Sequence, residues 1–310
     1  MSTLYLLVPG LFDSPYPDVS GDHPNLDMLL SRSHHVVENE DNFESLLCSF
    51  FDVHALQGED LPSAALMLSG EGGEPHSDYW AAVAPVHLHA DRDRLLLSPL
   101  PCSAIEQADI DRLREAFNRH FGDDGLELFT DYPQRWYLRL RQQRKLTTAS
   151  LTQVAGRSLD PFLPQGADAP WLRGLMNESQ MLLHSLDIPS LNGLWMWGFG
   201  RLPQLLQSPF GELSGTHPLL RGLQLHSATA CRGDDRLLVA DACQQALESG
   251  SRRLWIEAVE SLDALLAGEL KALSTGGLGQ ITLLDGAGLR FEFRPWMRFR
   301  WWRKPYPGNP

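Results

Sequence analysis

LYLLVPGLFDSP, Leu4–Pro15, near the start of the chain, gives the clearest indication of the fold. Its apolar run, Tyr5–Val8, predicts a buried strand, and Pro9-Gly10 predicts a turn directly after it. An acidic loop that carries Asp13 follows. This order is typical of the first strand of a parallel sheet, whose carboxyl end points toward a ligand site. We therefore expect the strand tip at Pro9 to lie at a functional site, or at one that has lost its chemistry.

The composition is that of a folded globular protein. The chain has 310 residues, 43% of them hydrophobic and 21% charged, which is enough for one large or two medium domains. Its net charge of −13 disfavours non-specific nucleic-acid binding. The sequence has neither a signal-peptide pattern nor an apolar run of roughly 18 residues, and its widely spaced cysteines indicate reduced packing residues. We expect a cytoplasmic protein with no membrane partner and no cofactor.

Strand-like and helical patterns alternate along most of the chain. The strand-like runs include Tyr5–Val8, Leu194–Trp197, Arg253–Ala258, Gln280–Leu284 and Leu289–Arg294. The helical patterns include Asn25–Ser33, Asn42–Phe51, Trp171–Leu186, Asp235–Leu247 and Leu262–Leu273. This alternation predicts an α/β fold with a mostly parallel sheet flanked by helices.

The middle of the chain breaks this alternation. Residues 88–155 read as strand, helix (Ala104–His120), and two strands joined by a short turn. We therefore predict a small inserted α+β module over 88–155. The α/β core is then formed by 1–87 and 156–310, and the Gly/Pro-punctuated link from Gly156 to Pro170 leads back into it.

Two segments are candidates for binding an anionic ligand. In EDLPSAALMLSGEGGEP (59–75), Pro62-Ser63 precedes a small apolar run, so Ser63 is predicted at a helix N-terminus, and Gly70–Gly73 permit close backbone approach. In LNGLWMWGFGRLP (191–203), a predicted strand that contains Trp197 ends in Gly198-Phe199-Gly200, and Arg201 comes next. The two glycines let backbone amides face a ligand, and an arginine beside them suits a phosphate or carboxylate. The structural alternatives are a simple N-cap at Ser63 and a tight turn at the glycines.

Two further segments have weaker functional patterns. His87 and His89 lie on one side of a predicted strand and could bind a metal with Asp91 or Asp93, or form only a polar face. The C-terminal LRFEFRPWMRFRWWRKPYPGNP interleaves basic and aromatic residues. Such a pattern can bind single-stranded nucleic acid. It is also typical of a closing segment that packs its rings inward or contacts a protein, which the negative net charge favours.

Taken together, these segments resemble the archaeal-type cofactor-independent phosphoglycerate mutases of the alkaline phosphatase superfamily. LYLLVPGLFDSP followed by HPNLDMLL is similar to their opening strand, Asp-Gly turn and Pro-Asn-x-Asp helix. LPSAALMLSGEG is similar to their nucleophile segment, and LWMWGFGRLP to their Trp-Gly-Gln-Gly loop. Over nearly its full length the chain more closely resembles the bacterial RpfE-type regulatory proteins, through pieces such as NGLWMWGFGRLP and the terminal RWWRKP.

The resemblance implies a two-metal phosphoryl-transfer site, several of whose ligands this chain lacks. Pro9 stands where the family has its first aspartate ligand. Ser63 matches the nucleophile, but Ala64 replaces the aspartate after it, and Asp285 is followed by Gly286 where an Asp-His pair is expected. The resemblance therefore implies a retained fold without the catalytic metals.

Three functions remain open from the sequence. The first is a non-catalytic regulatory protein that binds an anionic small molecule or a protein partner, with ligand candidates Ser63, Trp197, Gly198, Gly200 and Arg201. The second is a divergent metal-dependent mutase or phosphatase, with candidate metal ligands Asp13, His87, His89 and Asp285. The third is a module whose C-terminal segment contacts nucleic acid or membrane, which the net charge of −13 disfavours.

Overall fold

The computed structural model describes residues 2–13, 23–37, 42–91, 94–132, 135–189, 191–204, 206–228 and 233–304. The chain divides into two compact units. Unit 1 comprises Met1–Asp52, Leu206–Leu220 and Ser227–Pro310, and unit 2 comprises Val53–Leu205 and Arg221–His226. Each unit has its own main sheet and its own hydrophobic core. Among the described helices, none is both long and apolar enough to cross a bilayer.

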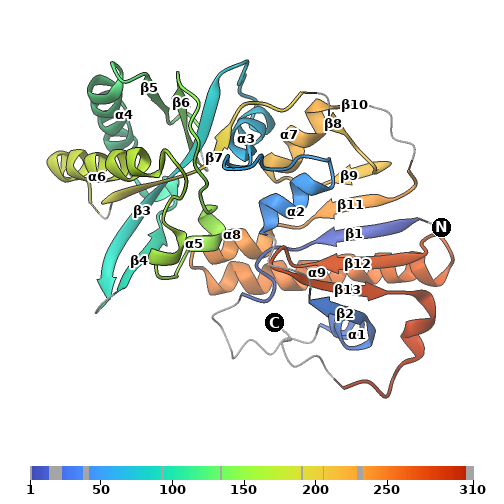
Figure 1. The fold of residues 1–310 in the computed structure, drawn as a ribbon. Coiled ribbons are helices and arrows are strands. Elements are labelled where there is room, and N and C mark those ends of the chain that lie inside the picture. Colours follow the sequence, from blue (N-terminus) through green and yellow to red (C-terminus); the bar gives the residue numbers. More distant parts are fainter. Residues whose placement is uncertain are drawn as a thin grey trace. The chain divides into compact units, whose positions relative to one another are not determined.

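Unit 1 is built on a six-stranded sheet with the order β2-β13-β12-β1-β11-β9 (Figure 1). Its strands are β1 (Thr3–Leu7), β2 (His34–Val37), β9 (Glu212–Ser214), β11 (Arg236–Val239), β12 (Gln280–Leu284) and β13 (Leu289–Phe293). β1 pairs in parallel with β11 and β12, and β11 pairs in parallel with β9. β13 and β2 extend the sheet in antiparallel fashion. The predicted α/β fold with a largely parallel sheet is confirmed.

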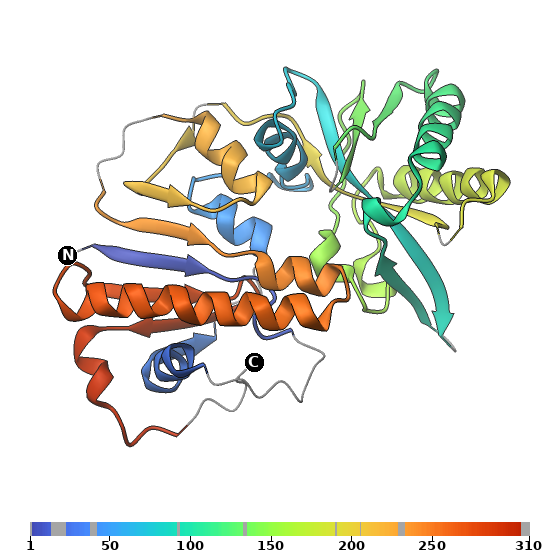
Figure 2. The same cartoon turned by 180° about the vertical axis from the view of Figure 1, so that it is seen from behind.

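The side chains of β1 alternate between the two faces of this sheet. Leu4 and Leu6 are buried in a core with residues of α1 (Pro24–Arg32), α8 (Ala242–Glu248) and α9 (Arg252–Ser274). The orange helices α8 and α9 cover one face in Figure 2. Tyr5 contacts Phe50, which follows α2 (Phe43–Ser49), and Phe210. Helices therefore cover both faces, as the apolar first strand requires.

Two sequence predictions in unit 1 are wrong. Arg253–Ala258, predicted as a strand, belongs to α9, because its buried residues recur with helical spacing along the whole of Arg252–Ser274. The predicted helix Asp235–Leu247 divides into β11 and α8. The first half becomes a strand because it pairs with β1 on one side and β9 on the other, a long-range effect that local propensity does not contain.

Unit 2 is built on an antiparallel sheet whose centre is the long strand β3 (Tyr79–Asp91). β3 pairs with three neighbours, and the other strands are β4 (Arg94–Pro99), β5 (Leu126–Phe129), β6 (Trp136–Leu140) and β7 (Gly193–Gly200). The predicted insertion, 88–155, is therefore only part of this unit. Its proposed boundary at 87/88 cuts through β3, and β7 pairs with β3 from beyond residue 155.

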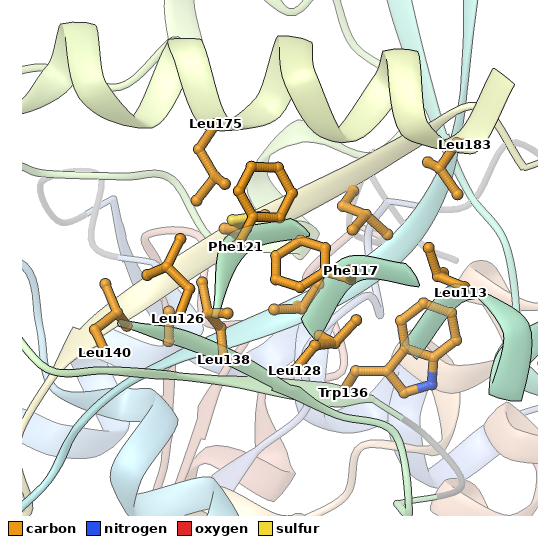
Figure 3. Close-up of a cluster of buried hydrophobic side chains, with 14 of the residues drawn as sticks. Leu113, Phe117, Phe121, Leu126, Leu128, Trp136, Leu138, Leu140, Leu175 and Leu183 are labelled. Carbon is orange, nitrogen blue, oxygen red and sulfur yellow. The ribbon is translucent and has the colours of Figure 1, made fainter. Parts of the chain in front are cut away.

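The core of unit 2 lies between this sheet and two helices, α4 (Gln107–Phe121) and α6 (Ala169–Leu186) (Figure 3). Leu113, Phe117 and Phe121 of α4 meet Leu138 and Leu140 of β6 there. A third helix, α3 (Ser63–Gly70), packs against β3 and β7. The remaining elements are α5 (Leu151–Val154), α7 (Pro218–His226), β8 (Leu206–Gln207), β10 (Ser227–Ala228) and the 3₁₀ helices Cys102–Ala104, Asp160–Phe162 and Pro295–Phe299.

Candidate functional site

Ser63 is the first residue of α3, at the helix N-terminus that the sequence predicts. It is not the N-cap: Pro62 occupies that position, without a side-chain capping bond. Ser63–Ser69 are all buried, as expected for a helix of small and apolar residues in a core. The Ser63 hydroxyl is fully buried and has no hydrogen-bond partner among the described residues. Such a group is costly unless a ligand or a function uses it.

The glycines of β7 allow the strand to approach the start of α3 closely. Gly198 has a φ of +70°, and a Cβ there would lie 2.4 Å from Oγ of Ser63 and 3.0 Å from the amide nitrogen of Ala64. A Cβ on Gly200 would lie 2.3 Å from Cβ of Pro62. Both glycines are therefore required by the packing of β7 against α3 within unit 2.

Asp60 holds this loop in place. Its Oδ2 accepts hydrogen bonds from the amides of Gly198, at 3.0 Å, and Phe199, at 3.1 Å, and from the hydroxyl of Thr148. Its Oδ1 accepts from the amide of Thr148 at 3.3 Å. The amides that we expected to face a ligand thus donate to a carboxylate of the protein itself. An external anion would have to displace Asp60 to bind them.

The other two residues predicted at this loop differ in exposure. Trp197 is buried in β7, 4% exposed. Arg201 follows β7 and is exposed to solvent, and its guanidinium donates a hydrogen bond of 2.6 Å to the carbonyl of Ser77. Arg201 is therefore the predicted ligand residue that offers a positive charge at the surface of unit 2.

In unit 1, the tip of β1 has the turn predicted from Pro9-Gly10. Pro9 is buried, and Gly10 has a φ of +79°, the left-handed conformation that glycine adopts readily. The amide of Val8 donates to the carbonyl of Leu284 at 2.8 Å, which places the ends of β1 and β12 side by side. The turn is kept, but Pro9 offers no side-chain oxygen for a metal.

Asp285 follows β12, and its side chain accepts hydrogen bonds within the hairpin that β12 and β13 form. Oδ1 accepts from the amides of Ala287 and Leu289, both at 2.8 Å. Burial raises the pKa of the Asp285 carboxyl, these two amides lower it, and the negative charge of Asp13 raises it further. Two of the predicted metal candidates, Asp13 and Asp285, are therefore close enough to repel each other within unit 1. Gly286 has a φ of +77°, and a Cβ there would approach Cβ of Phe43 to 3.1 Å.

The predicted pair His87 and His89 lies on β3, with ring centroids 6.0 Å apart and planes inclined by 21°. His87 is half-buried and His89 is exposed. Asp93, a suggested co-ligand, lies outside the described residues. Within the part of the chain that the structure describes, no group of three or more His, Cys, Asp or Glu side chains could hold a metal ion. The donor set of the described residues thus does not fit the two divalent ions that the resemblance implies.

The sequence reasoning missed a buried polar cluster at the end of α3. Glu71 forms an ion pair with Arg135, at 3.5 Å from its Nε, and accepts a hydrogen bond from the hydroxyl of Tyr137. Burial raises the pKa of the Glu71 carboxyl, and Arg135 and Tyr137 partly oppose that shift. A Cβ on Gly73 would come within 2.4 Å of the Tyr132 hydroxyl, so within the stretch 70–73 it is Gly73 that serves packing. This cluster joins Glu71, which follows α3, to Arg135 and Tyr137 more than 60 positions further along the chain, so only the tertiary structure shows it.

No family model matches the chain, and no curated protein matches it. Two solved structures are similar to it over most of its length. The cofactor-independent phosphoglycerate mutase from Thermoplasma acidophilum is 15% identical, covers 94% of this chain and 89% of its own, and has a TM-score of 0.42. A protein from Pyrococcus horikoshii is 14% identical, covers 94% and 87%, and has a TM-score of 0.46. Similarity at this level establishes neither a family nor an activity for this chain.

Proposed function

We propose that this chain is a non-catalytic regulatory protein of the RpfE type on a phosphoglycerate mutase-like scaffold, and that it binds an anionic small molecule or a protein partner in the cytoplasm. The observation that carries the proposal is the hairpin at Asp285. The resemblance implies a metal-binding Asp-His pair at positions 285 and 286. Instead Asp285 bonds its own hairpin, and Gly286 has a left-handed backbone with Phe43 against it, where a histidine side chain would be strained.

Two more positions support the same interpretation. Pro9 and Ala64 stand where the family has acidic ligands, and neither has a side-chain oxygen that could bind a metal. Ser63, at the nucleophile-like position, is closed in by Gly198, whose amide Asp60 engages. A two-metal mechanism needs ligands on both sides of the nucleophile, so these changes remove its chemical basis. Exposed Arg201 is the residue that would attract an anionic ligand.

Activity is tested by incubating the purified protein with 2- and 3-phosphoglycerate in the presence of Mn²⁺. We expect no interconversion above the level of the Ser63→Ala variant. Robust turnover that Ser63→Ala abolishes would show that the chain is an enzyme and would overturn the non-catalytic assignment.

Anion binding is tested by calorimetry with 3-phosphoglycerate and with inorganic phosphate. Arg201→Gln should weaken binding about tenfold, since a charge-assisted hydrogen bond is lost. Arg112→Gln is the matched control, because Arg112 is also exposed in unit 2 and also donates to a backbone carbonyl, that of Leu186, at 2.6 Å. Equal effects of the two variants would contradict a ligand role for Arg201.

One observation favours the alternative, a divergent metal-dependent mutase or phosphatase. The negative charge of Asp13 contributes to the raised pKa of the Asp285 carboxyl in unit 1, and a divalent cation would relieve that repulsion. Calorimetric titration with Mn²⁺ separates the two proposals. Tight binding that Asp285→Asn removes would favour the enzyme, whereas the regulatory proposal expects no tight binding.

A further inference from the structure

The segment after β13 exposes an unusual number of aromatic rings. Trp296 is 53% exposed, Phe299 60%, Trp301 79% and Trp302 64%. From the sequence we expected these rings to pack inward or to contact a protein, and these four do not pack inward. We call residues 296–304 the aromatic–basic patch; they include Arg298, Arg300, Arg303 and Lys304. In Figures 1 and 2 the red segment that follows β13 continues past the sheet of unit 1. So dense a group of exposed rings indicates an interaction surface.

The patch is attached to the body of unit 1. Met297 is buried in the same core as α1. Arg32, at the end of α1, donates to the carbonyl of Arg298, and Arg300 donates to the carbonyl of Arg32 at 3.4 Å. These contacts hold the backbone of the segment while leaving the rings exposed. The rings are thus presented by a folded element.

The charge of the patch is opposite to that of the rest of the chain. From Phe293 to Lys304 the sequence has no Asp or Glu, and its charged residues are Arg294, Arg298, Arg300, Arg303 and Lys304. The whole chain carries −13. At physiological salt, charges more than about 8 Å away are largely screened, so a partner at the patch is attracted mainly by the local positive charge. Charge complementarity therefore requires an anionic partner.

The arrangement of the rings distinguishes between anionic partners. The guanidinium of Arg300 lies over the Trp296 ring, 4.3 Å from its centroid, and that of Arg298 lies over Phe299 at 4.6 Å. Trp301 and Trp302 meet edge to face, at 81°. Bases of a single strand stack on successive exposed ring faces, which this arrangement does not align. Tryptophan at a bilayer interface needs no common ring orientation, and arginine beside it can contact lipid phosphates.

We propose that the aromatic–basic patch binds the surface of an anionic lipid bilayer. Trp301 and Trp302 enter the headgroup region, and Arg303 and Lys304 remain at the level of the lipid phosphates. The contact is peripheral, which agrees with the lack of a membrane-spanning helix among the described residues. It differs from the expectation from sequence that this chain has no membrane partner, and the experiment below decides between the two. It is also independent of the proposed ligand site in unit 2.

The test is cosedimentation of the full-length protein with vesicles of phosphatidylcholine alone and of phosphatidylcholine with about one third phosphatidylserine. We expect binding to the anionic vesicles only, and we expect it to weaken as salt rises. Arg303→Gln/Lys304→Gln should lower the partition coefficient by about tenfold or more, from the loss of two charges near the surface. Trp301→Ser/Trp302→Ser should lower it on anionic vesicles by a similar factor.

The matched control is Met181→Ser/Arg119→Gln in unit 2. It also removes an exposed apolar side chain, 73% exposed, and an exposed arginine, and it should bind like the unchanged protein. Far-UV circular dichroism confirms that each variant is folded; the substituted side chains are exposed. Absence of binding to anionic vesicles at low salt, or equal loss in the control and patch variants, would overturn the proposal. Retention of a fluorescent dT20 oligonucleotide without vesicle binding would also overturn it, in favour of nucleic acid.

Discussion

Substitution of Gly198 by alanine tests the central claim about unit 2, that β7 closes over the start of α3. Gly198 has a left-handed φ of +70°. An added methyl group would stand 2.4 Å from Oγ of Ser63 and 3.0 Å from the amide nitrogen of Ala64. The second atom belongs to the backbone and cannot rotate away. Gly198→Ala should therefore destabilise unit 2 through both backbone strain and steric overlap.

The magnitude follows from these two terms. A left-handed conformation costs an alanine about 1–2 kcal/mol relative to its right-handed form. An extra methyl group in a packed core costs about 1–3 kcal/mol more. The smaller entropy of the unfolded alanine chain offsets about 0.4–1 kcal/mol. We expect a net loss of about 3 kcal/mol in the free energy of unfolding.

Two further variants separate the terms. Gly72, also in unit 2, has a φ of +89° and no atom within 4 Å of an added Cβ among the described residues, so Gly72→Ala should show the strain alone, about 1 kcal/mol. Ser63→Ala removes a buried hydroxyl and should stabilise by about 1 kcal/mol. In the double variant Gly198→Ala/Ser63→Ala the overlap with Oγ is gone. The free energy of unfolding of the double variant should therefore be about 1 kcal/mol higher than the sum of the two single effects predicts.

The assay is urea unfolding followed by fluorescence and circular dichroism, with the two probes compared because the chain has two units. Gly198→Ala should lower the midpoint well below that of Gly72→Ala. The reasoning is refuted if the two alanine variants are equally stable, or if Ser63→Ala does nothing for Gly198→Ala. Either result would mean that β7 does not approach α3 closely enough to bring a Cβ on Gly198 within 2.4 Å of Oγ of Ser63.

Two other predictions concern carboxylates. Because burial raises the pKa of the Asp285 carboxyl, the folded state favours the protonated carboxyl. The stability that this preference contributes is fully present below the ordinary pKa of 3.8 and is lost as pH rises through the raised pKa. Asp285→Asn, which keeps an acceptor for the hairpin amides, should therefore gain stability relative to the unchanged protein between pH 3.8 and 7, measured by urea midpoints; a constant difference would contradict this. Asp60→Ala should destabilise by about 2 kcal/mol and speed amide exchange at Gly198 and Phe199, whose amides lose their acceptor; unchanged exchange there would contradict the loop's dependence on Asp60.

Much of the fold could be predicted from local sequence. Gln280–Leu284 is a strand with the predicted bounds, and α1 and α6 lie within two residues of prediction at each end. These elements have clear periodicity and clear ends, such as Pro24 before α1. α9 and β11 were mispredicted because short apolar runs fit a strand or a helix equally well, and only pairing with β1 or packing along a whole helix face decides between them.

The candidate site was predicted only in part. The sequence identified Ser63, the glycines of β7 and Arg201, and it identified the turn at Pro9 with its missing oxygen. It could not show that Asp60, three residues before Ser63, binds the amides of Gly198 and Phe199. That contact joins residues 138 positions apart, so no local pattern contains it.

By itself, the sequence determined which side chains this protein has for chemistry: a proline, an alanine and a glycine at three positions where the family resemblance expects ligands, and a C-terminal segment rich in arginine and tryptophan. The tertiary structure alone decided how those side chains are used. Asp285 accepts hydrogen bonds from amides of its own hairpin, and Trp301 and Trp302 are exposed to solvent and do not pack in the core. Composition sets the possible interactions, but burial and hydrogen-bond partners arise only when distant segments meet, and these decide whether a polar or aromatic group faces a ligand, the core or the solvent.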